Sequence, residues 1–282
     1  MTTPADAEAL ARAVAFARAA DVGAAERAEP HRWGVALHDA AHPHTYVLNT
    51  LAIDRPLDAR TDASAVAAEL DRLYASLGHR RVVVDDDATG ARVADGLRDR
   101  GYAATAELVM LLDMSTHPAR SEGAATTARP RARESTEAEL RAVERAFMLE
   151  DGRERDIADE VLDARAAVCA TRPGTRFFVA ALDGRDVASA TLYSDGAIAQ
   201  VEDVGALASA RGHGLGRAVV AAAIEAAVTA GHELVFIVGE EDDWPKDLYA
   251  RMGFRPIGRT WDCLREARRR DAAPGDRAPG PA

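Results

Sequence analysis

The sequence predicts an α/β protein of two domains, each built on a mixed, mostly antiparallel sheet flanked by helices. Apolar runs with the periods of strands and helices alternate along both halves of the chain. Three β-rich runs in the second half are joined by the turn pairs Asp183-Gly184 and Asp195-Gly196, which predicts an antiparallel meander. The length of 282 residues also favours two domains, since a typical domain has about 150 residues.

The stretch at residues 115–129 is polar, contains Gly and Pro, and shows no apolar periodicity. It predicts a linker between a first domain at residues 1–114 and a second at residues 130–267. Residues 268–282 lack large apolar side chains, so we expect a disordered tail there.

In the first domain, helical and strand patterns alternate. Predicted helices cover residues 7–20, 61–77 and 89–100, and predicted strands cover residues 33–37, 45–53, 81–85 and 102–112.

The second domain opens with two helices. Thr136 and Glu139 match a capping box, which predicts a helix start, and a further helix is expected over residues 155–170. After the meander, residues 215–230 are apolar nearly all round, which predicts a deeply packed helix that ends at Gly231.

The end of the second domain is expected to hold a buried strand and a short helix. The strand lies within HELVFIVGEEDD, at residues 232–243, and ends in acidic side chains. The helix is expected between Asp243, as its cap, and Gly253.

Composition restricts the class of protein. The net charge of −11 argues against a general nucleic-acid or anionic-membrane binder, and no apolar run reaches the ~18 residues that span a bilayer. The two cysteines, Cys169 and Cys263, have no disulfide or zinc spacing. We expect a cytoplasmic protein without a metal, and we interpret His38, His42 and His44 as surface residues rather than metal ligands.

The seven residues RGHGLGR, at positions 211–217, follow the meander and open the apolar helix. Backbone amides that converge at a helix N-terminus form an anion site, because they lack partners in the helix and the helix dipole favours negative charge. Glycine allows a ligand to approach the backbone, and Arg211, His213 and Arg217 add positive charge. The loop is therefore interpreted as a pyrophosphate site; the alternative is a tight strand-to-helix turn.

Two better-known phosphate loops do not fit this segment. The Walker pattern requires a lysine that the loop lacks. In a dinucleotide fingerprint that starts at Gly212 and Gly214, the last glycine falls at position 217, which is Arg217. A nucleotide-binding oxidoreductase is therefore disfavoured.

Residues 130–265 resemble the GNAT superfamily of acyl-CoA-dependent N-acyltransferases. Residues 211–216 match its signature [QR]-x-x-G-x-[GA], and LYARMGF, at residues 248–254, matches a later segment of the family. The chain departs from the family pattern at Ala208, where proline is common, and at Asp242, where asparagine often begins the later segment.

The resemblance implies acetyl-CoA as a cosubstrate. The cofactor-binding residues carried over by position are Val204, Ala206, Arg211, Gly212, His213, Gly214, Leu215, Gly216, Arg217 and Asp242. It also implies that Tyr249 serves as a general acid for the departing thiolate, whereas the structural alternative is an aromatic residue packed in the core.

Attack on a thioester requires a base, because an alkyl amine with a pKa of ~10.4 is protonated at neutral pH. Strand alternation places Glu202, Val204 and Ala206 on one face and Asp203 on the other. Glu202 is therefore the first candidate base and Asp203 the second. The alternative for either carboxylate is solvation or pairing with an arginine.

The first domain resembles a degenerate copy of the second. RVVVDDDATGARVADGLRDRGYAA repeats the order of strand, acidic end, short helix and Gly-aromatic pair, but no glycine lies between Gly34 and Gly78, where a pyrophosphate loop would fall. We hypothesise that this domain is structural and walls one side of the substrate cleft or stabilises the second domain.

These observations lead to two functions from different classes. The first is an N-acetyltransferase acting on a small-molecule or peptide amine, and the second is a CoA-sensing or partner-binding module without turnover. The identity of the amine and the oligomeric state, including a homodimer, stay open at the level of sequence.

Overall fold

The computed structural model describes residues 3–114 and 130–266. The predicted linker at 115–129 and the predicted tail at 268–282 lie outside the described residues. Below, the first half is residues 3–114 and the second half is residues 130–266. None of the helices in these two ranges is both long and apolar enough to cross a membrane.

The first half runs from a long helix to a long strand. Its elements are α1 (Pro4–Ala24), β1 (Arg27–His31), β2 (Gly34–His38), the 3-10 helix η1 (Tyr46–Leu48), β3 (Leu51–Ile53), α2 (Ala63–Leu73), β4 (His79–Val84), α3 (Asp87–Arg98) and β5 (Ala103–Leu112).

The second half contains the predicted meander and the glycine loop. Its elements are β6 (Ala132–Ser135), α4 (Glu137–Glu150), α5 (Arg155–Ala170), β7 (Arg176–Leu182), β8 (Arg185–Asp195), β9 (Ile198–Ala206), the 3-10 helix η2 (Ala208–Ala210), α6 (Leu215–Ala230), β10 (Leu234–Glu240), α7 (Pro245–Arg251) and β11 (Phe254–Glu266).

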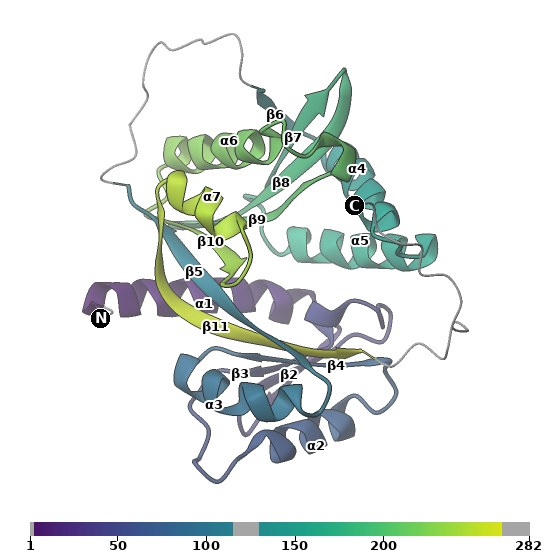
Figure 1. Ribbon diagram of the computed structural model, residues 1–282, viewed down its shortest axis with the longest axis vertical. Coiled ribbons are helices and arrows are strands. Elements are labelled where there is room, and N and C mark those ends of the chain that lie inside the picture. Colours follow the sequence, from purple (N-terminus) through teal and green to yellow (C-terminus); the bar gives the residue numbers. More distant parts are fainter. Residues whose placement is uncertain (1–2, 115–129, 267–282) are drawn as a thin grey trace, which may run out of the picture.

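The predicted fold class, a mixed sheet flanked by helices, is confirmed. The strands of both halves form one sheet in the order β1-β2-β3-β4-β11-β5-β10-β9-β8-β7-β6 (Figure 1). Most neighbours are antiparallel, whereas β3 with β4 and β9 with β10 are parallel. Each parallel pair is connected by one helix, α2 or α6.

The two halves exchange their last strands. The series β3-α2-β4-α3-β5 in the first half corresponds to β9-α6-β10-α7-β11 in the second. Yet β11 lies next to β4, and β5 lies next to β10, with β5 and β11 pairing antiparallel along their lengths (Figure 1). The sheet of each half is therefore completed by a strand from the other.

Side-chain contacts support this exchange. Arg81 on β4 makes a bidentate ion pair with Asp262 on β11, with an Nη2–Oδ2 distance of 2.7 Å. On one face of the central strands, the Phe16 ring of α1 packs edge-to-face on Phe236 of β10, with centroids 5.9 Å apart. The first helix of the chain thus covers strands from the second half.

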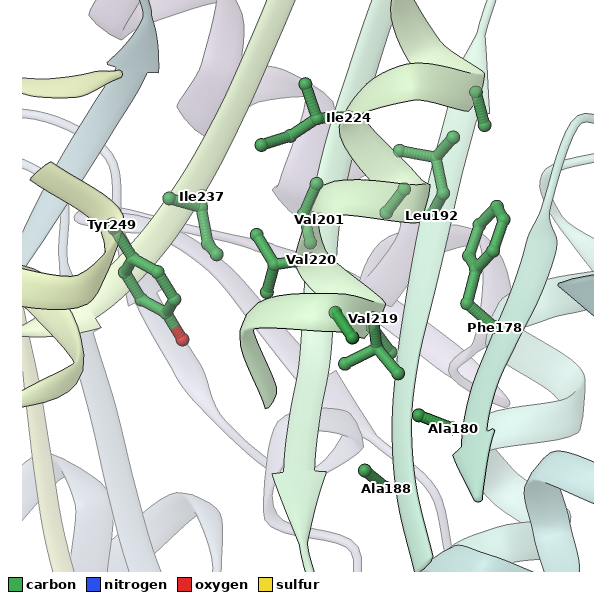
Figure 2. Close-up of a cluster of buried hydrophobic side chains, with 14 of the residues drawn as sticks. Phe178, Ala180, Ala188, Leu192, Val201, Val219, Val220, Ile224, Ile237 and Tyr249 are labelled. Carbon is green, nitrogen blue, oxygen red and sulfur yellow. The ribbon is translucent and has the colours of Figure 1, made fainter. Parts of the chain in front are cut away.

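The opposite face of the second half is covered by α6. Its apolar side chains pack on β7, β8, β9 and β10 in a continuous core, as Figure 2 shows for Val219, Val220 and Ile224. The predicted helix ends at Gly231 with a φ of 79°, a conformation that glycine adopts readily.

The predicted helix cap and hairpin turn, which depend on particular side chains, are confirmed. The Thr136–Glu139 capping box is present at the start of α4. Asp183 and Gly184 have φ angles of 51° and 80°, as a tight hairpin turn between β7 and β8 requires.

Three predictions of local structure are wrong or incomplete. Residues 46–48, expected within a strand, form η1 instead. Asp243 is not the cap of α7: the cap is Trp244, and the Asp243 carboxylate only accepts the Trp244 N–H at 2.8 Å. Strands β1, β6 and β11 were not predicted, because polar residues interrupt their alternation and the ladders that hold them are formed by backbone groups.

Candidate active site

Strands β9 and β10 diverge in the middle of the sheet. Their parallel ladder runs from Leu234 and Ile198 to Ile237 and Val201, and stops there. Beyond this point β9 continues along β8, whereas β10 continues along β5. Among the described residues, the backbone of β9 from position 202 to 206 therefore has no ladder partner on its β10 side.

The glycine loop follows this unpaired edge directly. From Gly212 to Arg217, no backbone N–H donates a hydrogen bond within the described residues. Gly212 and Gly214 have φ angles of 79° and 75°, and Gly214 is the N-cap of α6 without any side-chain cap. A Cβ at Gly212 or Gly216 would meet no atom within 4 Å.

Six consecutive amides thus lie free at the positive end of a helix, with open space beside the glycines. This is the geometry that an anion such as a pyrophosphate requires. Leu215 is buried in the core and anchors the start of α6, whereas Arg211, His213 and Arg217 are exposed around the loop.

The corresponding helix of the first half has no such opening. The Asp62 side chain caps α2 by accepting the Ala65 N–H at 2.9 Å. This carboxylate occupies the helix N-terminus and would repel an anion. The N-terminus of α2 therefore offers an anion no free site of the kind found at α6.

A β-bulge at Asp203 changes the side-chain pattern that alternation predicts. Asp203 has a φ of 56°, and the register with β8 shifts between Ser189 and Thr191. As a result, Glu202 and Asp203 both line the same cavity, whereas Val204 packs on the α6 side of the sheet. The predicted faces are wrong here: Glu202 does not share its face with Val204.

Asp203 is held by two partners. Arg165 on α5 lies 3.0 Å from one of its oxygens, and the Tyr193 hydroxyl donates to the other at 3.0 Å. Arg165 also pairs with Glu144, a buried residue on α4. Even beside that guanidinium, burial raises the pKa of Glu144 to about 7.

Glu202, by contrast, has no ion pair among the described residues. Its carboxylate accepts a hydrogen bond from the Gln200 amide, on the same side of β9. Burial, together with the negative charges of Asp203 and Glu107, raises the pKa of Glu202 to about 8. Such a carboxyl group can exchange a proton near neutral pH.

Tyr249 lies on the other side of the diverging strands. Its side chain extends from α7 toward the cluster that contains Ile237 and Val220 (Figure 2), and its ring lies close to Gly239, where a Cβ would be 3.3 Å away. Burial and the negative charge of Glu202 raise the pKa of Tyr249 to about 12, so the phenol is protonated at neutral pH. Tyr249 is thus packed in the core and at the same time electrostatically coupled to Glu202.

A cavity of about 400 Å³ lies on the α1 and α5 face of the sheet. It is lined from the first half by α1, the η1 segment, β4 and β5, and from the second half by α5, β9 and β10. Its size is that of a small-molecule site. Glu202 and Asp203 mark the place where this cavity meets the diverging strands.

The remaining predicted residues lie as follows. Ala206 is the last residue of β9, opposite Ala188 of β8. Asp242 is exposed in the turn between β10 and α7. Sequence reasoning missed Arg165, Glu144, Gln200 and Glu107, because single polar residues on a helix or strand carry no motif.

Comparison with known proteins supports this description. Residues 138–254 match the model of the Acetyltransferase (GNAT) family. The predicted resemblance of the second half to this family is therefore confirmed. A search of curated proteins found none that matches this chain.

Several solved structures share this fold over most of the chain. A GCN5-related N-acetyltransferase from Kribbella flavida is 20% identical, with a TM-score of 0.59 over 90% of this chain and 95% of that one. A GCN5-related N-acetyltransferase from Sphaerobacter thermophilus is 15% identical, with a TM-score of 0.53 over 86% and 76%. A conserved protein of unknown function from Staphylococcus epidermidis is 14% identical, with a TM-score of 0.57 over 82% and 90%. At these identities the likeness shows that the fold is shared, including the first half.

The raised carboxyl pKa values predict how stability depends on pH. The folded state holds protons on Glu202 and Glu144 that the unfolded chain releases near pH 4.5, so the free energy of unfolding falls as pH rises toward 8. Glu202→Gln removes one of these groups, so its stability relative to wild type is expected to increase by about 4 kcal/mol between pH 5 and pH 8.5. Urea unfolding at both pH values measures this.

The matched control is Glu225→Gln, which removes an exposed carboxylate on α6. It should leave the pH dependence of unfolding as in wild type. Equal slopes for Glu202→Gln and wild type would contradict the raised pKa of Glu202.

Proposed function

We propose that the protein is an N-acetyltransferase that transfers an acetyl group from acetyl-CoA to a primary amine. One observation carries the proposal: the unpaired edge of β9 leads directly into six successive free amides at the start of α6. An extended ligand with amide groups and a pyrophosphate has complementary chemistry along that path. The match of residues 138–254 to the model of the GNAT family supports the same cosubstrate.

Different residues would bind the pyrophosphate and the pantetheine arm of acetyl-CoA. The amides from Gly212 to Arg217 would hold the pyrophosphate, with Arg211 and Arg217 beside it. The free backbone groups at Val204 and Ala206 would pair with the pantetheine arm. Asp242 lies in the turn at the far side of β10 and stays a predicted contact.

When bound, acetyl-CoA supplies a thioester carbonyl that accepts the electron pair of the amine as the carbon–sulfur bond breaks. Glu202 takes the proton that the ammonium group must lose. An ordinary glutamate, with a pKa of ~4.3, is a poor acceptor from an ammonium of ~10.4. The raised pKa of Glu202, about 8, is closer to the pKa of the ammonium group, so proton transfer to Glu202 is easier.

Asp203 is less suited to this role. Its two oxygens are engaged by Arg165 and Tyr193, so it holds the bulge that directs Glu202 into the cavity. Tyr249 remains protonated at neutral pH and can supply a proton to the departing thiolate. These assignments favour an enzyme over a CoA-sensing module, because a sensor needs neither proton donor nor acceptor.

Obstructing the loop should abolish cosubstrate binding. Gly216 has no left-handed φ and open space around its Cβ position, so Gly216→Trp is expected to fold and to weaken acetyl-CoA binding at least tenfold. Isothermal calorimetry of both proteins measures this. Gly78→Trp, in open space in the first half, is the control and should bind as wild type.

If the wild type fails to bind acetyl-CoA, the loop is only a strand-to-helix turn and the proposal falls. If Gly216→Trp binds as tightly as wild type, the cosubstrate lies elsewhere.

Replacing the proposed acid separates the enzyme from the sensor. Tyr249→Phe removes only the hydroxyl and is expected to lower kcat at least tenfold while acetyl-CoA affinity and thermal stability stay unchanged. Thiol release from acetyl-CoA with a panel of primary amines measures kcat. An unchanged kcat would contradict the role of Tyr249, and no thiol release by wild type with any amine would favour the sensor.

A further inference from the structure

We infer that Glu107, contributed by the first half of the chain, forms with Glu202 a two-carboxylate site that holds the ammonium group of the amine acceptor. This inference rests on the proposed function and assigns the part of the cavity where the acceptor is bound. It gives the first half a direct role in recognising substrate.

The strand exchange places Glu107 of the first half between two strands of the second half. Glu107 lies on β5, opposite Glu240 of β10 and Thr260 of β11 in the two ladders. Its side chain lines the same cavity as Glu202, and the charges of these two carboxylates interact. Without the exchange, β5 would not lie beside β10.

The carboxylates that line the cavity are not equivalent. Asp21 and Asp85 lie beside Arg18, at 3.7 and 3.1 Å, and Asp203 lies beside Arg165. Glu107 and Glu202, in contrast, make no ion pair within the two described ranges. They are therefore the two cavity carboxylates whose charge an incoming cation can balance.

Among the described residues, none of the charged groups around Glu107 forms an ion pair with it. Asp262 and Glu240 face it from β11 and β10, and both are acidic. Arg81 on β4 also faces Glu107, but its guanidinium forms a bidentate ion pair with Asp262. Thr260 donates the remaining hydrogen bond to Glu107.

A second observation concerns a buried hydroxyl group in this cavity that has no hydrogen-bond partner. Thr45, at the start of η1, lines the cavity with only 6% of its surface exposed, and its hydroxyl makes no hydrogen bond within the described residues. A buried hydroxyl without a partner costs free energy unless a bound molecule satisfies it. The cavity thus offers two uncompensated carboxylates and one free hydroxyl to a cationic, polar molecule.

Electrostatics favours a cation strongly at this place. Burial and the charge of Asp262 raise the pKa of Glu107 to about 7, and burial with nearby acids raises that of Glu202 to about 8. An ammonium group between them removes the repulsion and stabilises both charged forms, so protons leave the carboxyl groups as the amine binds.

The test is calorimetric titration of the full chain, with CoA present, using butylamine, 1,4-diaminobutane and 2-phenylethylamine as probes. At least one amine is expected to bind the wild type, and Glu107→Gln to weaken that binding at least tenfold. Butanol, the uncharged analogue, should not bind. Acetyl-CoA affinity should be equal in both proteins, since Glu107 lies outside the loop.

The matched control is Glu240→Gln. Glu240 is exposed and lies directly opposite Glu107 in the ladder, but does not line the cavity. It should change amine affinity less than twofold. Titrations in two buffers of different ionisation enthalpy count the protons that are released as the amine binds. The wild type should release more protons than Glu107→Gln. A purely structural role of Glu107 would not produce this difference.

Unchanged amine binding by Glu107→Gln, or an equal loss in Glu240→Gln, would overturn the inference. So would a wild type that binds none of the amines. The acetyl-CoA titration of the same samples reports separately on the proposed function, so failure of the cation site and failure of the cosubstrate site are distinguishable.

Discussion

The backbone ladders of β5 and β11 determine the rest of this structure. Each strand leaves its own half and lies between two strands of the other, so β4, β11, β5 and β10 are neighbours. Hydrogen bonds of the main chain therefore join the two halves, and side-chain contacts such as Arg81 with Asp262 add to them. As a consequence, the cavity is lined from both halves, and Glu107 lies beside residues of the second half.

The candidate site occurs where regular structure is interrupted. The β9–β10 ladder ends at Val201, and one residue beyond Glu202 the bulge at Asp203 reverses the alternation. The bulge is stabilised by Arg165 and Tyr193, which hold the Asp203 carboxylate. Burial of the Glu202 carboxyl group disfavours its charged form, so the folded state loses stability as this group ionises at higher pH.

Sequence reasoning predicted the parts of the site that local chemistry determines. The glycine loop requires positive φ angles and open backbone, and Gly212 and Gly214 provide both. Glu202 was predicted as the base because strand alternation placed it on the same face as Val204 and Ala206, and the bulge at Asp203 breaks that alternation. A single aspartate with a φ of 56° leaves no periodic signal, so the bulge could not be predicted.

The strand exchange could not be predicted from the sequence either, but the cause is different. Hydrophobic periodicity indicates that a segment is a strand, but not which strand it will pair with. The segments of β5 and β11 fit their own half or the other half equally well by pattern. The ion pair of Arg81 with Asp262 depends on this choice, and so does the presence of Glu107 in the same cavity as Glu202. Both are therefore visible only in the structure.

The central claim is that free backbone amides on β9 and in the loop hold acetyl-CoA. Amide hydrogen exchange, measured by mass spectrometry with and without acetyl-CoA, tests it most directly. We expect slower exchange at residues 202–206 and 212–217, and no change at the start of α2, where Asp62 already caps the helix. Protection confined to other segments, or no protection at all, would contradict the account.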